Sequence, residues 1–226
     1  MPDPTALVAV LRGWLPRGTG LGNADPRAAS DGLMPGEFLN HAVPARLREF
    51  AAGRAAARIA MAAIGLPPRA IPQSSDRTPQ WPAGVVGSIS HCAELCLALV
   101  GNTKDWDGLG IDVELDHSLD RSLWSDILCR DESEWLDRLA VDDRGPAALA
   151  IFVAKEAAYK AQYKTSRTVF GFDALGVRLT GQTFAATFRH AVHGYSIGDT
   201  LHGRLIRESG YVVALCSIPN QKRPAG

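Results

Sequence analysis

The chain has 226 residues, the length of one compact unit or of two small associated halves, and too short for a large multidomain protein. Its 24 basic and 24 acidic residues cancel, which argues against a dedicated nucleic-acid-binding protein, since such proteins need a basic excess. No apolar run reaches the roughly 18 residues of a membrane helix, and the N-terminus lacks the features of a secretory signal. We therefore expect a cytoplasmic protein that acts without nucleic acid or membrane.

The charges are unevenly distributed along the chain although they cancel in total. Asp105–Asp143 contains 13 acidic and 3 basic residues, whereas the part from Arg144 onward contains 11 basic and 4 acidic residues. This arrangement is typical of a site where a cation and a phosphate-rich ligand meet, or of two solvated faces.

The spacing of apolar residues predicts two rounds of a helix followed by strands. A short helix is predicted at Thr5–Trp14, and the rest of the first 43 residues is expected to be irregular because it is rich in Pro, Gly and Asp. The further predicted elements are a helix at Pro44–Ile64, two paired strands within Val85–Gly101, a strand at Leu109–Asp116, a helix at Pro146–Lys164, and strands at Ala174–Thr180 and Tyr211–Ile218. The pattern predicts an α+β chain made of two similar halves.

The predicted strand at Leu109–Asp116 carries a carboxylate at every second position. Asp112, Glu114 and Asp116 should share one face of the strand, and the apolar residues between them should face the core. Like charges on one face repel, and a divalent cation with oxygen ligands would offset this repulsion. Mg²⁺ commonly takes one or two carboxylates together with substrate phosphates. The alternative is an edge strand with a solvated acidic face.

Glu156 and Lys160 fall on the apolar stripe of the second long helix. A buried charge is costly unless it is paired or binds a metal, so this placement indicates a site. Alternatively, the two residues form a surface pair while the alanine face of the helix packs inward. Lys155, the neighbour of Glu156, could reach an anion bound near that carboxylate.

Candidate anion-binding residues occur in the first half of the chain. Arg54 and Arg58 lie four residues apart on one helix, a spacing that suits a phosphate group as well as a solvated face. Ser90 and His91 end a predicted strand, and Arg77 precedes a proline-rich turn. No GxSxG motif surrounds Ser90 or Ser88, which argues against a hydrolase with a catalytic triad.

Taken together and in chain order, these segments resemble the 4′-phosphopantetheinyl transferase superfamily. The resemblance rests on EFAAGRAAARIAMAAIG, RTPQWPAGVVGSISHC, GIDVE, and FVAKEAAYKA followed by FGFD, and it covers about Glu49–Asp173. Within the superfamily, the chain is most similar to the bacterial group of enterobactin synthase component D and Sfp-like enzymes.

The resemblance implies two similar α/β halves related by pseudo-twofold symmetry, which we expect at residues 1–108 and 109–226. Coenzyme A is expected between them, with its adenosine and 3′-phosphate on the first half and its metal and pyrophosphate on the second. The implied activity is that of a holo-acyl-carrier-protein synthase: Mg²⁺-dependent transfer of 4′-phosphopantetheine to a serine of an acyl or peptidyl carrier protein, with release of adenosine 3′,5′-bisphosphate. Mn²⁺ is an expected substitute for Mg²⁺, and a monomer is expected because one chain contains both halves. Siderophore or other secondary-metabolite synthesis is an expected setting.

The resemblance also implies roles for individual residues. Asp112, Glu114 and Glu156 would bind the metal, Lys155 and Lys160 would contact the pyrophosphate and the leaving group, and Glu156 or a water it orients would accept the proton of the carrier serine. Arg54, Arg77 and His91 would hold the 3′-phosphate, Ser90 would lie beside the adenosine, and Arg58 is a weaker candidate for CoA binding. Two alternatives are a non-catalytic protein that binds CoA or a carrier protein, and a metal-dependent nucleotide phosphodiesterase.

Overall fold

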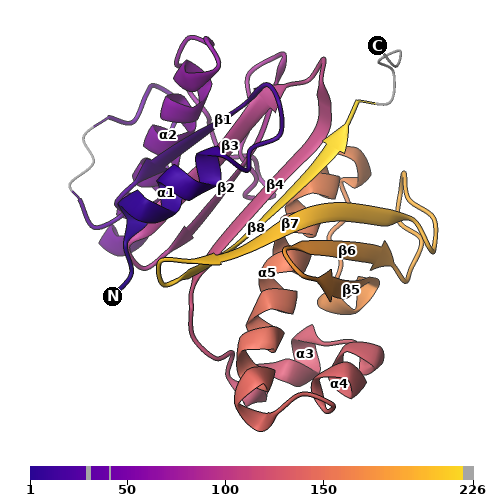
Figure 1. The fold of residues 1–226 in the computed structure, drawn as a ribbon. Coiled ribbons are helices and arrows are strands. Elements are labelled where there is room, and N and C mark those ends of the chain that lie inside the picture. The colour runs from indigo at the N-terminus through magenta and orange to yellow at the C-terminus, as the bar shows by residue number, and fades with distance from the viewer. Residues whose placement is uncertain (29–31, 41, 221–226) are drawn as a thin grey trace.

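The computed structural model describes residues 1–28, 32–40 and 42–220, and within these ranges the strands form two antiparallel sheets (Figure 1). The first sheet has the strand order β1-β3-β2, and the second has the order β4-β8-β7-β6-β5. The strands are β1 (Thr19–Ala24), β2 (Val85–Cys92), β3 (Leu95–Asn102), β4 (Trp106–Leu115), β5 (Leu175–Thr180), β6 (Thr183–Phe188), β7 (Thr200–Glu208) and β8 (Tyr211–Pro219).

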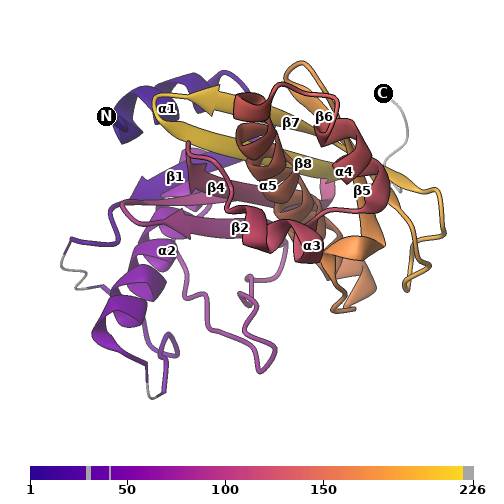
Figure 2. The same ribbon diagram turned by 90° about the horizontal axis from the view of Figure 1, so that it is seen from below.

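Two long helices cover the sheets, one in each half of the chain (Figures 1 and 2). The helices are α1 (Pro4–Arg12), α2 (Pro44–Ala63), α3 (Trp124–Ile127), α4 (Arg130–Leu136) and α5 (Val141–Ser166), with 3₁₀ turns η1 (Arg121–Leu123) and η2 (Phe172–Ala174). Pro44 starts α2 at a position where a missing N–H costs nothing, and Gly65, with φ of 73°, follows its end. In the described part of the chain, no helix is both long and apolar enough to cross a membrane.

The two halves share the arrangement of three strands, to which the second half adds β6 and β5. In each half the first strand pairs with the last, and the last pairs with the strand that precedes it: β1-β3-β2 in the first half and β4-β8-β7 in the second. The helix packs on the first strand through glycines, since a Cβ on Gly22 would lie 2.0 Å from the Ala56 carbonyl oxygen and one on Gly110 would lie 1.9 Å from that of Ala157. The shared topology and the shared contact confirm the predicted α+β chain of two similar halves.

One core cluster joins the two sheets on the face opposite α2 and α5. Alternate residues of β3 and β8 point to this face, where Leu7 and Leu11 of α1 cover them. The cluster therefore includes residues of both sheets, among them Leu95, Leu97, Leu99, Ile111, Val113, Val213 and Leu215. Because α1 packs across both halves, the two sheets share one apolar core.

The structure corrects the expected start of the chain and extends one predicted helix. Residues 19–24 form β1, although their glycines predict a loop; they are extended because Gly20 and Gly22 allow α2 to pack closely. The helix expected from Pro146 begins at Val141, with Pro146 inside it, since one missing N–H removes one hydrogen bond and leaves the others. The acidic stretch after β4 also contains two short helices that the apolar spacing does not predict, α3 and α4.

Candidate active site

The two sheets meet where β2 lies beside β4 (Figure 1). Serine side chains of β2 connect the two strands. The backbone N–H of Ile111 donates to Ser88 Oγ at 3.1 Å, and that of Val113 donates to Ser90 Oγ at 3.4 Å. Two hydroxyl oxygens thus take the place of the carbonyl acceptors of a continuous ladder. We call this junction the seam.

Asp112 lies at the seam on the face of β4 that α5 covers, and it is almost fully buried. Its Oδ1 accepts hydrogen bonds from Ser90 Oγ at 2.7 Å and from Lys160 Nζ at 2.6 Å. Its Oδ2 is buried and has no hydrogen-bond partner among the described residues. Since a buried carboxylate oxygen without a partner is costly, this atom is suited to accept a cation or a donor that enters the cleft.

Glu114 and Glu156 line the same cavity as Asp112, a space of about 280 Å³. The pKa of Glu114 is raised to about 7, mainly by burial and further by the charges of Asp112 and Glu156, while Lys160 opposes the shift. Burial also raises the pKa of Glu156; Lys160 lowers it and Asp112 raises it. Both shifts follow from carboxylates crowded together in a partly buried place.

The three carboxylates supply the oxygen donors that Mg²⁺ prefers. Across residues 1–28, 32–40 and 42–220, no three acidic, histidine or cysteine side chains are grouped closely enough to form a metal cage by themselves. Mg²⁺ does not require one, because it usually completes its shell with water and substrate phosphates. Together with the unpartnered Asp112 oxygen, the donor set fits a divalent cation that binds along with a phosphate ligand.

Glu156 and Lys160 lie one turn apart on α5, with 4.0 Å between Oε2 and Nζ. The Lys160 ammonium group also donates to Ser90 Oγ at 3.2 Å. Both side chains are about one-quarter exposed, at the edge of the core where the cavity begins. The alanine face of the helix packs fully inward, at Ala154, Ala157, Ala158 and Ala161. The helix therefore combines the two alternatives: a buried alanine face and a charged pair that lines a cavity.

Arg54 of α2 also lines this cavity and adds a positive charge to its wall. Its guanidinium group stacks 3.6 Å over the centre of the Phe50 ring, and Nε donates to the Ile71 carbonyl oxygen at 3.0 Å. Nη2 is buried without a partner among the described residues. Burial lowers the pKa of Arg54 to about 10, so the group stays charged at neutral pH and can bind an anion.

His91, at the end of β2, lines the same cavity. Its Nε2 is 3.0 Å from Arg46 Nη1 and 3.6 Å from Glu49 Oε2. Burial lowers the pKa of His91, with further lowering by Arg46 and Lys160, and Glu49 opposes this effect. Neutral His91 between these charges can donate to or accept from a ligand.

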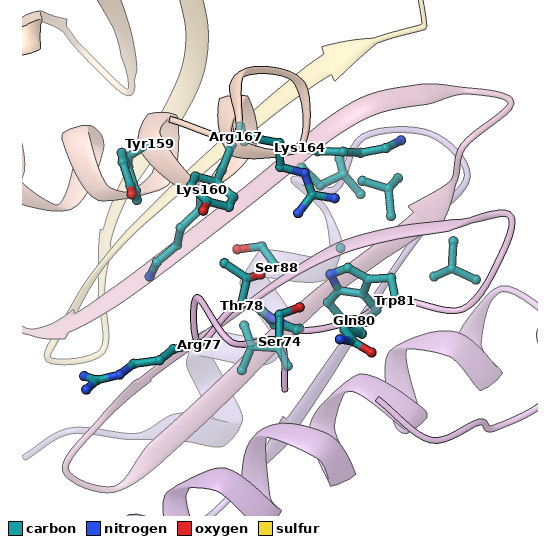
Figure 3. A pocket seen from close by; sticks show the side chains of 18 residues that line it. Ser74, Arg77, Thr78, Gln80, Trp81, Ser88, Tyr159, Lys160, Lys164 and Arg167 are labelled. Atoms are coloured by element: carbon teal, nitrogen blue, oxygen red, sulfur yellow. The ribbon is translucent and has the colours of Figure 1, made fainter. Parts of the chain in front are cut away.

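Arg77 lines both this cavity and a larger one of about 530 Å³ on the other side of Lys160. Its φ of 67° places it in the left-handed region, in a loop fixed by a 2.9 Å hydrogen bond from Tyr163 Oη to Asp76 Oδ2. Figure 3 shows Arg77 and Lys160 pointing to the same side of the larger cavity, whereas Lys164 extends toward the opposite side.

The structure does not bring the side chains of Arg58 and Lys155 to the ligand-binding groups above. Arg58 pairs with the buried carboxylate of Glu37 at 2.9 Å and lines neither of the two larger cavities. The ammonium group of Lys155 is buried and pairs with Glu132 at 2.8 Å. Asp116, expected on the face of Asp112, is exposed and pairs with Arg207.

Several cavity residues are absent from the sequence-based predictions. Arg46 and Phe50 precede Arg54 at intervals of four on α2, a periodicity that could have revealed their common face. The walls of the larger cavity combine residues of a loop and of the end of α5, which are far apart in sequence. They include Trp81, Tyr159, Tyr163, Lys164 and Arg167.

Comparison with known proteins identifies related sequences over most of the chain. The profile of the 4′-phosphopantetheinyl transferase N-terminal domain matches residues 34–101, and that of the 4′-phosphopantetheinyl transferase superfamily matches residues 108–216. The chain is 34% identical to 4′-phosphopantetheinyl transferase Svp of Streptomyces mobaraensis, over 86% of this chain and 80% of the relative.

Two further relatives agree with this result. Identity is 33% to 4′-phosphopantetheinyl transferase PptT of Mycobacterium tuberculosis, over 78% of this chain and 81% of the relative. It is 38% to enterobactin synthase component D of Escherichia coli K12, over 54% of this chain and 58% of the relative. With the two family profiles and the two long alignments, the chain belongs to the 4′-phosphopantetheinyl transferase superfamily, a family of transferases that use CoA to modify carrier proteins.

Proposed function

We propose that this protein transfers 4′-phosphopantetheine from coenzyme A to a serine of an apo acyl or peptidyl carrier protein, in a Mg²⁺-dependent reaction that releases adenosine 3′,5′-bisphosphate. The observation that carries the proposal is the cavity of about 280 Å³ at the seam, which we call the seam cavity. It is lined by the carboxylates of Asp112, Glu114 and Glu156 and by Arg54 and Arg77 of the first half, and one oxygen of Asp112 has no partner among the described residues. CoA carries a diphosphate and a separate 3′-phosphate, so it requires a cation site and an arginine-rich site in one cleft.

In this proposal the first half, residues 1–108, binds the 3′-phosphate and the adenosine. Arg54 and Arg77 hold the 3′-phosphate, and the buried Nη2 of Arg54 gains a partner when the phosphate binds. His91 adds a hydrogen bond to the phosphate, and Ser90 lies beside the adenosine end of the ligand. The residues of this half determine affinity for CoA and do not take part in bond breaking.

The second half, residues 109–226, acts on the diphosphate. Asp112, Glu114 and Glu156 would hold Mg²⁺, which neutralises charge on the diphosphate when bound. Lys160 exchanges its contact with Asp112 for the diphosphate and stabilises the charge that develops on the leaving phosphate oxygen.

Glu156, or a water that it orients, accepts the proton of the carrier serine. The serine oxygen bonds to the phosphorus of the pantetheine phosphate while the bond from that phosphorus to the bridging oxygen breaks. The proposal assigns no ligand contact to Lys155 or Arg58. Lys155 is already paired with the buried carboxylate of Glu132, and Arg58 with that of Glu37. It also requires no second copy of the chain.

The test is to incubate the purified protein with CoA, Mg²⁺ and a panel of apo carrier proteins, and to measure the intact mass of each carrier. We expect a gain of one phosphopantetheine group, lost when a chelator is added and regained with Mg²⁺ or Mn²⁺. Carriers of siderophore synthesis come first, since several relatives are named enterobactin synthase component D.

Other outcomes of the same experiment would favour other functions. CoA binding without modification of any carrier would indicate a non-catalytic CoA-binding protein. Cleavage of CoA without a carrier would indicate a phosphodiesterase. Asp112→Asn is the matched control, because it removes the charge at the seam and keeps a side chain of the same shape.

A further inference from the structure

A buried ion pair lies directly beside Glu156, and the proposed function does not use it. Lys155 Nζ lies 2.8 Å from Glu132 Oε2, and the two side chains are 1% and 2% exposed. Isolated buried charges are very costly, so such a pair persists only when its remaining hydrogen-bonding atoms are also satisfied. The remaining contacts therefore tell what the pair holds in place.

The pair forms five further hydrogen bonds, four of them with backbone groups of neighbouring segments and one from Lys155 Nζ to Cys129 Sγ at 3.4 Å. These bonds join α5 and α4 to the end of α3, to η2 and to β5. Lys155 Nζ donates to the carbonyl oxygens of Ile127 (2.8 Å) and Phe172 (3.0 Å), and the Glu132 carboxylate accepts from the backbone N–H groups of Cys129 and Val177 (both 2.6 Å).

Lys155 occupies in the second half the position that Arg54 occupies in the first. Arg54 precedes by two residues Ala56, whose carbonyl meets β1, and Lys155 precedes by two residues Ala157, whose carbonyl meets β4. Arg54 retains a buried nitrogen without a partner, whereas Lys155 donates to two carbonyls and a carboxylate. Of these two equivalent cations, Arg54 has capacity left for a ligand, and the contacts of Lys155 are internal.

The contact with Phe172 connects the ion pair to the wall of a third cavity. This space of about 200 Å³ is lined by Lys155, Glu156, Tyr159, Leu175 and the segment Phe170–Phe172. The ring of Phe170 packs edge-on against Tyr159, 5.1 Å between centroids, one turn of α5 beyond Lys155. The ion pair thus fixes this segment at the place where Glu156 faces both the third cavity and the seam cavity.

We propose that Glu132 and Lys155 are positioning residues, which hold Glu156 and the Phe170–Phe172 segment in their reactive arrangement without touching CoA. The inference rests on the proposed function, since that function gives Glu156 its role in the reaction. It replaces the CoA contact that the family resemblance implies for Lys155.

The test uses two single variants and their combination: Lys155→Gln, Glu132→Gln and the double variant. Each single change leaves one buried charge without its partner, whereas the double variant is a neutral amide pair. Its glutamines can still donate to Ile127 and Phe172 and accept from one backbone N–H.

We expect each single variant to lower kcat by about 100-fold at temperatures where circular dichroism shows a folded protein, because displacement of a reactive group by about 1 Å has an effect of this size. The Kd for CoA should stay near the wild-type value. In the double variant, kcat should return to within about 10-fold of wild type, because the two substitutions are coupled through one contact.

A destabilised control separates positioning from general loss of stability. Leu7→Ala shortens a buried side chain of α1, in the core cluster on the face opposite α2 and α5, and should lower Tm without changing kcat. If the single variants of the ion pair also keep the wild-type kcat while folded, the pair is only structural and the inference is overturned.

The same measurements distinguish this inference from the proposed function. If the double variant recovers its Tm but binds CoA weakly and stays inactive, Lys155 contacts the ligand, and the positioning role is wrong while the proposed function holds. If the wild-type protein modifies no carrier, the proposed function fails, independently of the variants. Unchanged CoA affinity with restored kcat in the double variant supports the positioning role.

Discussion

The two halves of the molecule use the same strand–helix contact and differ in what lies beside it. Two residues after Gly22, β1 has Ala24; two residues after Gly110, β4 has Asp112. On the helices, the Ala56 carbonyl meets Gly22 and the Ala157 carbonyl meets Gly110. Counted from these two alanines, Ala55 and Ile59 of α2 correspond to Glu156 and Lys160 of α5.

Three charged residues of the second half therefore stand where the first half has small or apolar side chains. The first half contributes cations from other positions, such as Arg54 and Arg77. The comparison teaches that the shared contact sets the geometry of the cleft and that the chemistry depends on a few neighbouring positions. Four predictions test this division.

The largest expected effect is on catalysis in the second half. Asp112→Asn should lower kcat by about 1,000-fold, an effect of the size seen when a preorganised charge-stabilising group is lost. The fold should persist, because the amide keeps the shape of the carboxylate and Lys160 is partly solvated. The measurement is the rate of carrier modification by mass spectrometry. Near-wild-type turnover would show that Asp112 is not part of the reactive site.

The next effect is on the contact that both halves share. Gly110→Ala and Gly22→Ala should each lower the free energy of unfolding by about 3 kcal/mol or more, because the added methyl group would lie about 2 Å from a helix carbonyl oxygen. Urea denaturation measures this change. Gly13→Ala is the control, since its added methyl group would approach no other atom within 3.4 Å. Unequal losses at Gly22 and Gly110 would show that the two contacts are not equivalent.

A smaller effect separates the ligand roles of the halves. Arg54→Gln should weaken CoA binding by about 30-fold with little change in kcat, since a charge-assisted contact is worth roughly 1.5–3 kcal/mol. The same variant should bind dephospho-CoA, which lacks the 3′-phosphate, as well as the wild type does. Isothermal titration with both ligands makes the comparison. An equal loss for both would place Arg54 away from the 3′-phosphate.

The smallest effect is on stability as a function of pH. The pKa of Glu114 in the folded protein, about 7, lies above the ordinary value of 4.5, so the folded state binds more protons than the unfolded state between these values. Glu114 therefore lowers the free energy of unfolding as the pH rises from about 4.5 to 7, by on the order of 2 kcal/mol. Without metal, Glu114→Gln should be more stable than wild type at pH 8 and similar at pH 4. A constant difference across this range would contradict the raised pKa.

Sequence patterns predict those helices and strands that are determined by residues close together in the chain. Pro44 and Gly65 bound α2, and the apolar alternation predicts β4 with Asp112 and Glu114 on one face. β1 could not be predicted in this way, because its glycines are explained by the approach of α2 and not by their neighbours in the chain.

The candidate site shows the same limit. Helical spacing places Glu156 and Lys160 together, and the strand period places Asp112 and Glu114 together. The spacing does not reveal that Lys155 pairs with Glu132, because this contact depends on how α4 folds back onto α5. Arg58 is similar, since Glu37 reaches it from a distant loop.

Ser90 gives the seam one further property. Its hydroxyl group accepts the Val113 N–H, which holds the sheets together, and donates to Asp112, which belongs to the site. The edge of β2 and the edge of β4 are therefore closed by a group that also responds to what the carboxylate binds. A ligand that draws Asp112 or Lys160 away would remove a partner of the Ser90 hydroxyl group. Ligand binding in the cleft would therefore act on one of the two serine hydrogen bonds that join the sheets.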